Sequence, residues 1–186
     1  MAVGLGNPGA EFAHTRHNAG ADTVALLATR HGERLKRSKE HALVAEARVG
    51  PCRLALAFPQ TYMNDSGRAV SPLVRRFGIT DLTRLVIVHD ELDLPLGTIR
   101  VKSGGGLAGH NGLRSIKAHL HSDAFTRLRI GIGKPPGGKE QGADHVLKSP
   151  SRRDRTELDV SIELAADAVE CILVEGLATA QNRFNG

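Results

Sequence analysis

The sequence predicts an α/β fold in a single domain, and three observations support this class. Segments with helical periodicity follow segments that alternate polar and apolar residues, as strands do. Residues 85–88 form a continuous apolar run, which is typical of a central strand buried on both faces of a sheet. The chain has 186 residues, of which 40% are hydrophobic, enough for one compact core. We therefore expect residues 1–186 to form one domain.

The opening segment, residues 4–20 (GLGNPGAEFAHTRHNAG), is predicted to be a loop with a catalytic or ligand-binding role. Its four glycines and Pro8 interrupt regular structure, and small residues allow backbone amides to approach a bound ligand. The loop contains the amides Asn7 and Asn18 and the imidazole of His17. An unperturbed imidazole titrates near pH 6.5, so His17 is the candidate base. The alternative is that His17 is a surface or capping residue.

The next elements are predicted from periodicity. Residues 19–31 carry a helical pattern that ends at Gly32. Residues 42–49 alternate as a half-buried strand, and residues 53–58 are expected to pair with it after a turn.

The segment 59–70 (PQTYMNDSGRAV) places Tyr62 and Asn64 in a short loop before a helix. Asp65 or Ser66 is in position to cap that helix. Asn64 at such a junction also has a structural explanation, because Asn is common in turns and caps. The helix is expected to bury Ala69, Val70, Leu73, Val74 and Phe77.

Polar residues follow the buried strand at 85–88. His89 and Asp90 lie at its carboxyl end, where open α/β sheets place their ligand sites. Two later strands, at 98–102 and 127–133, are predicted to direct Lys102 and Arg129 away from the core, where both can contact an anion.

Three further segments complete the expected architecture. A glycine-rich loop and a short helix at 113–120 separate the two basic strands. Residues 134–145 are expected to form a loop beside the site, either a mobile flap or a solvated connector. Residues 157–175 are predicted to be a long helix that packs on the core and ends at Gly176.

Charge and composition limit the class of partner. The net charge is +5 and the isoelectric point about 9.6, which favours an anionic partner without identifying it. Apolar runs are short and the start of the chain has no basic segment leading into an apolar one, so we expect a soluble protein without membrane contact. Cys52 and Cys171 lie far apart, as ordinary core residues of a cytoplasmic protein do.

Three enzyme classes fit the motifs poorly. The pattern G-x-G-x-x-G occurs at 4–9 and 104–109, but neither stretch begins a clear βαβ unit of a dinucleotide-binding fold. The polar cluster at 89–93 lacks the spacing of a metal hydrolase, and no HExxH motif is present. A serine hydrolase is disfavoured because there is no G-x-S-x-G motif.

The remaining constellation is a histidine, a carboxylate and several amides. Asp90 can hold the imidazole of His17 in its basic tautomer, and Asn side chains can bind a carbonyl oxygen. Such a set suits the activation of water without a covalent intermediate.

The motifs together resemble the bacterial peptidyl-tRNA hydrolase family. The resemblance is carried, in order, by GLGNPG, TRHNAG, YMNDSG, HDELDLPLG, RVKSGGGLAGHNGLRSI and RLRIGIG, and the terminal EGLATAQNRFN is similar as well. It covers the chain nearly end to end. Only three residues precede GLGNPG, where the family normally has a longer first strand, which implies either a weakened sheet edge or a choice of start site.

The resemblance implies a role for each matching residue. His17 is the catalytic base and Asp90 its supporting carboxylate. Phe12 stands where the family usually has Tyr, so the ring is kept without its hydroxyl. The implied substrate-positioning residues are Asn7, Asn64 and Asn111, with Tyr62 and His110 beside them, and the residues implied to hold the tRNA 5′-phosphate are Lys102 and Arg129.

The implied reaction is hydrolysis of the ester between a peptide and the 3′-terminal ribose of tRNA, which recycles tRNA from stalled translation. The implied enzyme is cytoplasmic, usually monomeric, and works without a metal or other cofactor. The implied fold is an α/β domain with a mixed, mostly parallel twisted sheet flanked by helices. The alternative is a function that is not enzymatic, namely a tRNA- or RNA-binding protein without catalysis. The excess of basic over acidic residues also permits this function.

Overall fold

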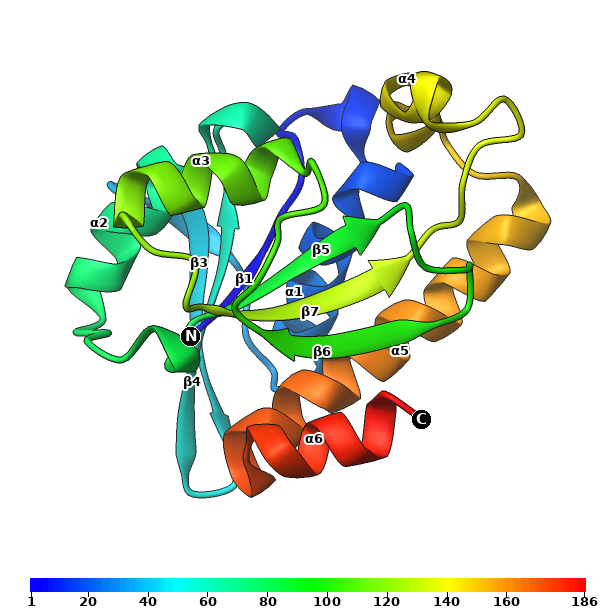
Figure 1. The fold of residues 1–186 in the computed structure, drawn as a ribbon. Coiled ribbons are helices and arrows are strands. Elements are labelled where there is room, and N and C mark those ends of the chain that lie inside the picture. The colour runs from blue at the N-terminus through cyan, green and yellow to red at the C-terminus, as the bar shows by residue number, and fades with distance from the viewer.

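A computed structural model of the chain shows a mixed seven-stranded sheet with helices on both faces (Figure 1). The structure describes residues 1–186 apart from the side chain of Lys139. The strands are β1 (Ala2–Gly4), β2 (Lys36–Ser38), β3 (Ala42–Val49), β4 (Cys52–Pro59), β5 (Val86–Glu91), β6 (Ile99–Ser103) and β7 (Thr126–Gly131).

The sheet order is β2-β3-β4-β1-β5-β7-β6. The central pairs β4–β1, β1–β5 and β5–β7 are parallel, whereas β2–β3, β3–β4 and β6–β7 are antiparallel. The predicted α/β class with a mixed sheet is therefore confirmed, and its parallel pairing occupies the centre of the sheet.

Two helical layers enclose the sheet. In Figure 1, α1 and α5 lie behind it and α2 and α3 in front of it, while α6 runs below β6. Each face has its own apolar core, one shared with α1 and α5 and the other with α2 and α3. The helices are α1 (Ala19–Arg30), α2 (Gly67–Arg76), α3 (Asn111–Leu120), α4 (Gly142–Leu147), α5 (Arg152–Glu175) and α6 (Leu177–Phe184).

Most predicted elements are confirmed with small shifts at their ends, and two differ by more. α5 begins at Arg152 rather than near 157, because the Ser151 side chain accepts a hydrogen bond from Asp154 N at 3.1 Å and starts the helix earlier. Residues 134–145, expected to be a loop, contain a 3₁₀ turn at Lys139–Gln141 and the start of α4.

Besides α4, two further elements were not predicted. β2 has only three residues, two of them charged, and α6 follows α5 after the single residue Gly176, so neither has a clear periodic signal. β1 is equally short, but it pairs with both β4 and β5 and is fully buried. The first strand is thus central, and the expectation that its shortness weakens a sheet edge is wrong.

The start of α2 is organised by a neighbouring helix. Ser66 precedes α2, but its hydroxyl donates to Met63 O at 2.7 Å, so the expected side-chain cap does not form. Instead, Gly67 N donates to Ser115 Oγ of α3 at 2.9 Å. A Cβ on Gly67 would lie 2.4 Å from Ser115 O. Glycine is therefore required where α2 and α3 meet.

Close packing also explains two glycines of the opening segment. A Cβ on Gly4 would lie 2.0 Å from Gly20 O, and a Cβ on Gly20 would lie 2.1 Å from Val88 O. The first turn of α1 therefore rests directly on the backbones of β1 and β5. This contact fixes the turn just before α1 relative to the end of β5.

In the part of the chain that the structure describes, no helix has both the length and the apolar character needed to span a bilayer.

Candidate active site

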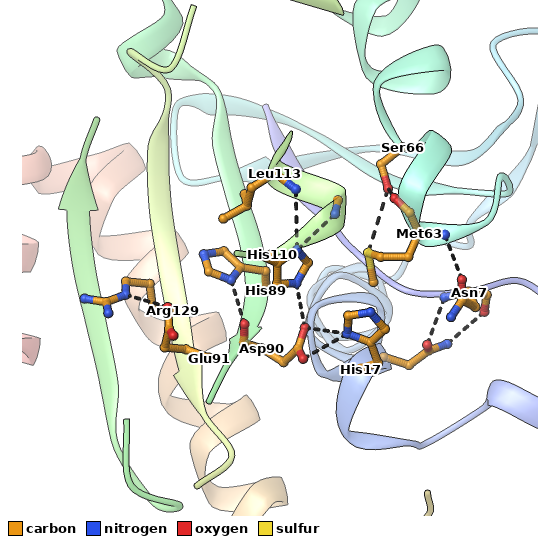
Figure 2. A network of polar contacts seen from close by, with 12 residues as sticks. Asn7, His17, Met63, Ser66, His89, Asp90, Glu91, His110, Leu113 and Arg129 are labelled. Atoms are coloured by element: carbon orange, nitrogen blue, oxygen red, sulfur yellow. Dashed lines mark hydrogen bonds and ion pairs between the residues drawn. The ribbon is translucent and has the colours of Figure 1, made fainter. Parts of the chain in front are cut away.

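The site centres on a carboxylate that two histidines share (Figure 2). His17 lies in a 3₁₀ turn, Arg16–Asn18, that leads into α1, and Asp90 lies near the end of β5. His17 Nδ1 lies 3.0 Å from Asp90 Oδ1 and 2.9 Å from Oδ2. His110 Nε2 lies 2.8 Å from Asp90 Oδ1. The structure thus joins His17 and Asp90, as the sequence predicted, and adds His110 to the pair.

The start of α3 fixes the tautomer of His110. This residue caps the helix, and its Nδ1 accepts from Gly112 N at 3.1 Å and from Leu113 N at 3.4 Å. Because Nδ1 accepts, Nε2 carries the proton that is donated to Asp90. His17 donates through Nδ1 in turn, which leaves its Nε2 as a lone-pair acceptor.

The shared carboxylate sets the ionisation of the site. Burial by itself would raise the pKa of Asp90, but its electrostatic interactions and hydrogen bonds with His17 and His110 hold it far below its ordinary value. Burial would lower the pKa of His17, yet the charge of Asp90 and its hydrogen bond prevail and raise it. Asp90 is therefore an anion across the pH range in which His17 titrates, and it stabilises the protonated form of His17.

His89 supports the cluster from inside the sheet. Its ring meets the His110 ring edge-on, with centroids 5.0 Å apart. Complete burial, aided by the electrostatic effect of the nearby His110 and Arg127, lowers the pKa of His89 to about 3. Its Nδ1 lies 2.8 Å from Asp90 O and therefore donates to that carbonyl. His89 is a neutral packing partner of His110 and does not line the pocket that opens beside Asp90.

An amide cluster lies on the other side of His17. Asn7 N donates to Asn18 Oδ1 and Asn18 Nδ2 donates to Asn7 O, both at 2.9 Å. Asn7 Oδ1 accepts from Met63 N at 2.7 Å. The Asn7 side chain is thereby oriented with its oxygen occupied, and its Nδ2 remains available as a donor. Asn18 and Met63 were not among the predicted site residues, although both lie within motifs that carry the family resemblance.

The remaining predicted substrate contacts are more exposed. Tyr62 is 61% exposed and meets the half-buried ring of Phe12 edge-on, with centroids 6.5 Å apart. Asn64 follows Met63 in the same 3₁₀ turn and is exposed. Asn111 is the exposed first residue of α3. These four side chains stand at the surface around the buried cluster.

A pocket of about 240 Å³ opens beside the shared carboxylate. One wall is α4, which is held by Arg16: this side chain donates to the carbonyls of His145 and Lys148, each at 3.4 Å, and to Asp154 at 3.2 Å. α4 was not predicted, so its contribution to the wall was not either. The pocket is lined by His17, Asp90, Glu91, Leu92, Ala108, Gly109, His110, Asn111, Gly142, Ala143 and Val146.

The basic strands β6 and β7 lie beside this pocket. In their register Lys102 faces Arg127, so Lys102 and Arg129 are diagonal neighbours on one face, about 7–8 Å apart along the sheet. Lys102 is exposed, and Arg129 is partly exposed with its Nε 3.1 Å from Glu91 Oε2. Arg127, which strand alternation places on the same face as Arg129, is buried under the loop that follows β6.

Three donor groups converge closely enough to hold a metal ion in the described part of the chain: those of His17, Asp90 and His110. Metal-bound histidines normally donate their second ring N–H to an acceptor. The second nitrogen of His110 instead faces two backbone donors, Gly112 N and Leu113 N. The hydrogen bonds around His110 therefore fit a role as a donor to the Asp90 carboxylate better than a role as a metal ligand.

Comparisons with known proteins agree with one another. A family model described as Peptidyl-tRNA hydrolase matches residues 1–186. The chain is 49% identical to the Peptidyl-tRNA hydrolase of Leifsonia xyli subsp. xyli, with 100% of this chain and 96% of the relative covered. It is 49% identical to that of Mycolicibacterium vanbaalenii, covering 98% and 94%. The crystal structure of peptidyl-tRNA hydrolase from Acinetobacter baumannii superposes with a TM-score of 0.92 at 43% identity, covering 100% and 93%.

Proposed function

This chain belongs to the peptidyl-tRNA hydrolase family, and from that premise we propose how its residues cleave the ester between a peptide and the 3′-terminal ribose of tRNA. The chain is accordingly an ester hydrolase that acts in translation. The observation that carries the proposed mechanism is the contact of His17 Nδ1 with Asp90 at 2.9 Å, which leaves Nε2 of the same ring as the acceptor.

In the proposed reaction, His17 Nε2 takes a proton from a water molecule as its oxygen attacks the ester carbonyl carbon. Asp90 stabilises the imidazolium that forms, and His110 holds Asp90 in place. When the tetrahedral intermediate collapses, the bond between the carbonyl carbon and the ribose oxygen breaks. The imidazolium returns its proton to that ribose oxygen, so no covalent enzyme intermediate is required.

The amides supply donors and orientation. Because Asn7 Oδ1 already accepts from Met63 N, Asn7 offers its Nδ2 to a carbonyl oxygen of the peptide or of the reacting ester. Asn111 lies at the pocket, and Asn64 follows the Met63 turn that holds Asn7. We assign all three amides to substrate positioning, with the edge-on ring pair of Phe12 and Tyr62 as an apolar contact surface beside them.

The substrate implies tRNA contacts outside the pocket. Lys102 and Arg129 share one face of the sheet, and we assign them to the 5′-phosphate of the tRNA, since Lys and Arg contacts give affinity for phosphate without reading sequence. Glu91 binds Arg129 only through Nε, so the two terminal guanidinium nitrogens can face a phosphate. We further propose that the enzyme acts as a monomer in the cytoplasm and without a metal.

The function is tested with N-acetyl-aminoacyl-tRNA in the presence of a chelator. Release of the N-acetyl amino acid at an undiminished rate is expected. Tight binding without release would instead favour the alternative of a tRNA-binding protein without catalysis. Activity that disappears only on chelation would mean that His17, Asp90 and His110 hold a metal after all.

A further inference from the structure

One buried cation plays no part in the mechanism above. Arg127 lies on β7, is 2% exposed, and is the bulkiest of the fully buried side chains described. Its Nη1 donates to Gly106 O at 2.5 Å and its Nη2 to Gly104 O at 2.9 Å. No described carboxylate lies within ion-pairing distance of it, and its Nε has no hydrogen-bond partner among the described residues. Both of its hydrogen bonds therefore go to carbonyls of a single loop.

That loop, residues 104–109, needs to be held. Positive φ angles occur at Gly104 (61°), Gly105 (90°), Ala108 (52°) and Gly109 (72°). Glycine-rich backbone has many accessible conformations, so fixing one costs more conformational entropy than elsewhere. Backbone hydrogen bonds reach only its ends, from Gly104 N to Phe125 O and from His110 N to Leu107 O. The guanidinium adds hydrogen bonds to the carbonyls of Gly104 and Gly106, in the first half of the loop.

Functional residues stand at both ends of this loop. Before it, the ammonium end of Lys102 lies against Gly105, where a Cβ would be 2.9 Å from Lys102 Cε and 3.0 Å from Nζ. After it come His110, which donates to Asp90, and Asn111, which lines the pocket. A displacement of the loop would therefore move both the phosphate-binding lysine and the histidine that holds the catalytic carboxylate.

We propose that Arg127 is a positioning residue of the enzyme, whose guanidinium fixes the 104–109 loop and thereby places Lys102 and His110 together in their working positions. The inference rests on the proposed function, because it concerns residues assigned to that reaction. Burying a guanidinium without a carboxylate is costly, and an apolar residue of similar volume would fill the same space. What an apolar side chain does not supply is the pair of donors to Gly104 O and Gly106 O.

The test compares Arg127→Met, which keeps most of the volume without the donors, with Arg127→Lys, which keeps a charge and a single donor group. Leu27→Ala is the matched control, because Leu27 is fully buried against α5 on the opposite face of the sheet and its truncation lowers stability without touching the loop. Each protein is assayed below its unfolding temperature on N-acetyl-aminoacyl-tRNA and on a minimal N-blocked aminoacyl-nucleoside. Amide exchange is measured at Gly104 and His110 and in β3.

Arg127→Met is expected to lower kcat about 10- to 100-fold on both substrates, because small displacements of positioning groups have effects of that size. It is also expected to raise KM for the tRNA substrate alone, since only that substrate has a phosphate for Lys102. Exchange should accelerate at Gly104 and His110 and remain slow in β3. Arg127→Lys should recover part of kcat, and Leu27→Ala should keep wild-type kcat and KM per folded molecule.

Unchanged kinetics and unchanged loop exchange in Arg127→Met would overturn the proposal. So would a decrease in activity that Leu27→Ala reproduces at an equal decrease in stability. Should Arg127→Met not fold, Arg127→Lys decides the question by the same two readouts. Failure of the proposed function itself is distinguishable, because the wild-type protein would then not release the N-acetyl amino acid.

Discussion

Asp90 accepts hydrogen bonds from His17 and His110 at once, and this sharing determines how the base titrates. As the proposed base, His17 acts only when its Nε2 is unprotonated. Because Asp90 outweighs burial and raises the pKa of His17, the acid limb of the rate profile is expected above pH 6.5, the ordinary imidazole value.

Asp90→Asn tests this coupling. The substitution removes the charge that raises the pKa of His17 but leaves the burial that lowers it, so the acid limb should move to lower pH. The plateau rate should fall as well, because the imidazolium formed in the reaction loses its stabilising partner. The measurement is kcat/KM from pH 5 to 9 for both proteins. An acid limb at the same pH in both would show that Asp90 does not control the base.

His89 makes a separate prediction about stability in acid. The unfolded chain protonates this residue near pH 6.5, whereas the folded protein keeps it neutral down to about pH 3, so folding stability falls as the pH drops through that interval. The expected slope from this one group is about 1.4 kcal/mol per pH unit. His17 contributes little slope well below pH 6, because the unfolded chain with an ordinary imidazole pKa and the folded protein with a raised pKa both bind its proton there.

Denaturant unfolding between pH 6 and 4 measures the effect of His89. His89→Asn removes the titrating group and retains a donor for Asp90 O, and it should lose less stability across this range than the wild-type protein. Parallel slopes in the two proteins would mean that His89 is protonated in the folded state.

The predicted site residues came from motifs, and the structure adds the contacts among them. The role of His110 depended on where α3 begins: the sequence suggested residue 113, whereas the helix starts at Asn111 and makes His110 its cap. Strand alternation places Arg127 on the same face as Arg129, but alternation identifies a face of the sheet and not what covers it. The covering loop is irregular, and no periodic pattern predicts its path.

At the scale of elements, the site depends on how closely α1 approaches the sheet. Gly4 and Gly20 leave no room for a Cβ between the first turn of α1 and the backbones of β1 and β5. His17 lies three residues before Gly20, and Asp90 lies two residues after Val88, whose carbonyl Gly20 contacts. The distance between base and carboxylate is therefore set by helix–sheet packing.

Gly20→Ala should push α1 away from β5 and separate His17 from Asp90. We expect a large decrease in kcat together with a decrease in stability, because the nearest atoms are backbone atoms that cannot rotate away. Gly32→Ala is the control: Gly32 follows the other end of α1, has φ 69° and has nothing within 4 Å of a Cβ. It should cost stability, by about 1 kcal/mol, without changing kcat. Normal turnover in Gly20→Ala would mean that the packing does not set the catalytic distance.

The elements that the sequence identified are those with enough residues to show a period, such as α1, β3 and β4. β2, α4 and α6 were missed because they are short or follow another helix directly, and tertiary contacts rather than local pattern stabilise them. The core of the fold is thus predictable from periodicity, whereas the order of the strands is not, since it depends on pairing between distant segments.

In the whole molecule, the residues proposed for the chemistry and those proposed for phosphate binding lie on neighbouring parts of one sheet. The reacting groups gather at the ends of β1 and β5, and Lys102 and Arg129 lie on the β6–β7 pair beside them. A substrate that spans both regions must present an ester and a phosphate together, as peptidyl-tRNA does.

Lys102→Ala combined with Arg129→Ala should raise KM for peptidyl-tRNA and leave a minimal N-blocked aminoacyl-nucleoside unaffected, because the minimal substrate has no 5′-phosphate. The salt dependence of tRNA binding should weaken by about one counterion for each phosphate-binding side chain that is removed. Measuring KM at low and high salt checks both points. Equal values for the wild type and the double variant would place the tRNA-binding surface elsewhere.

The role of His17 as the base is tested most directly by the single-turnover rate of N-acetyl-aminoacyl-tRNA hydrolysis. The rate is measured across pH for the wild-type protein and for His17→Asn, with the dissociation constant determined separately. We predict that His17→Asn lowers the rate about 10²- to 10⁴-fold, abolishes the acid limb above pH 6.5 and leaves binding nearly unchanged. A variant that keeps the wild-type rate, or that keeps the same acid limb, would contradict the assignment of His17 as the base.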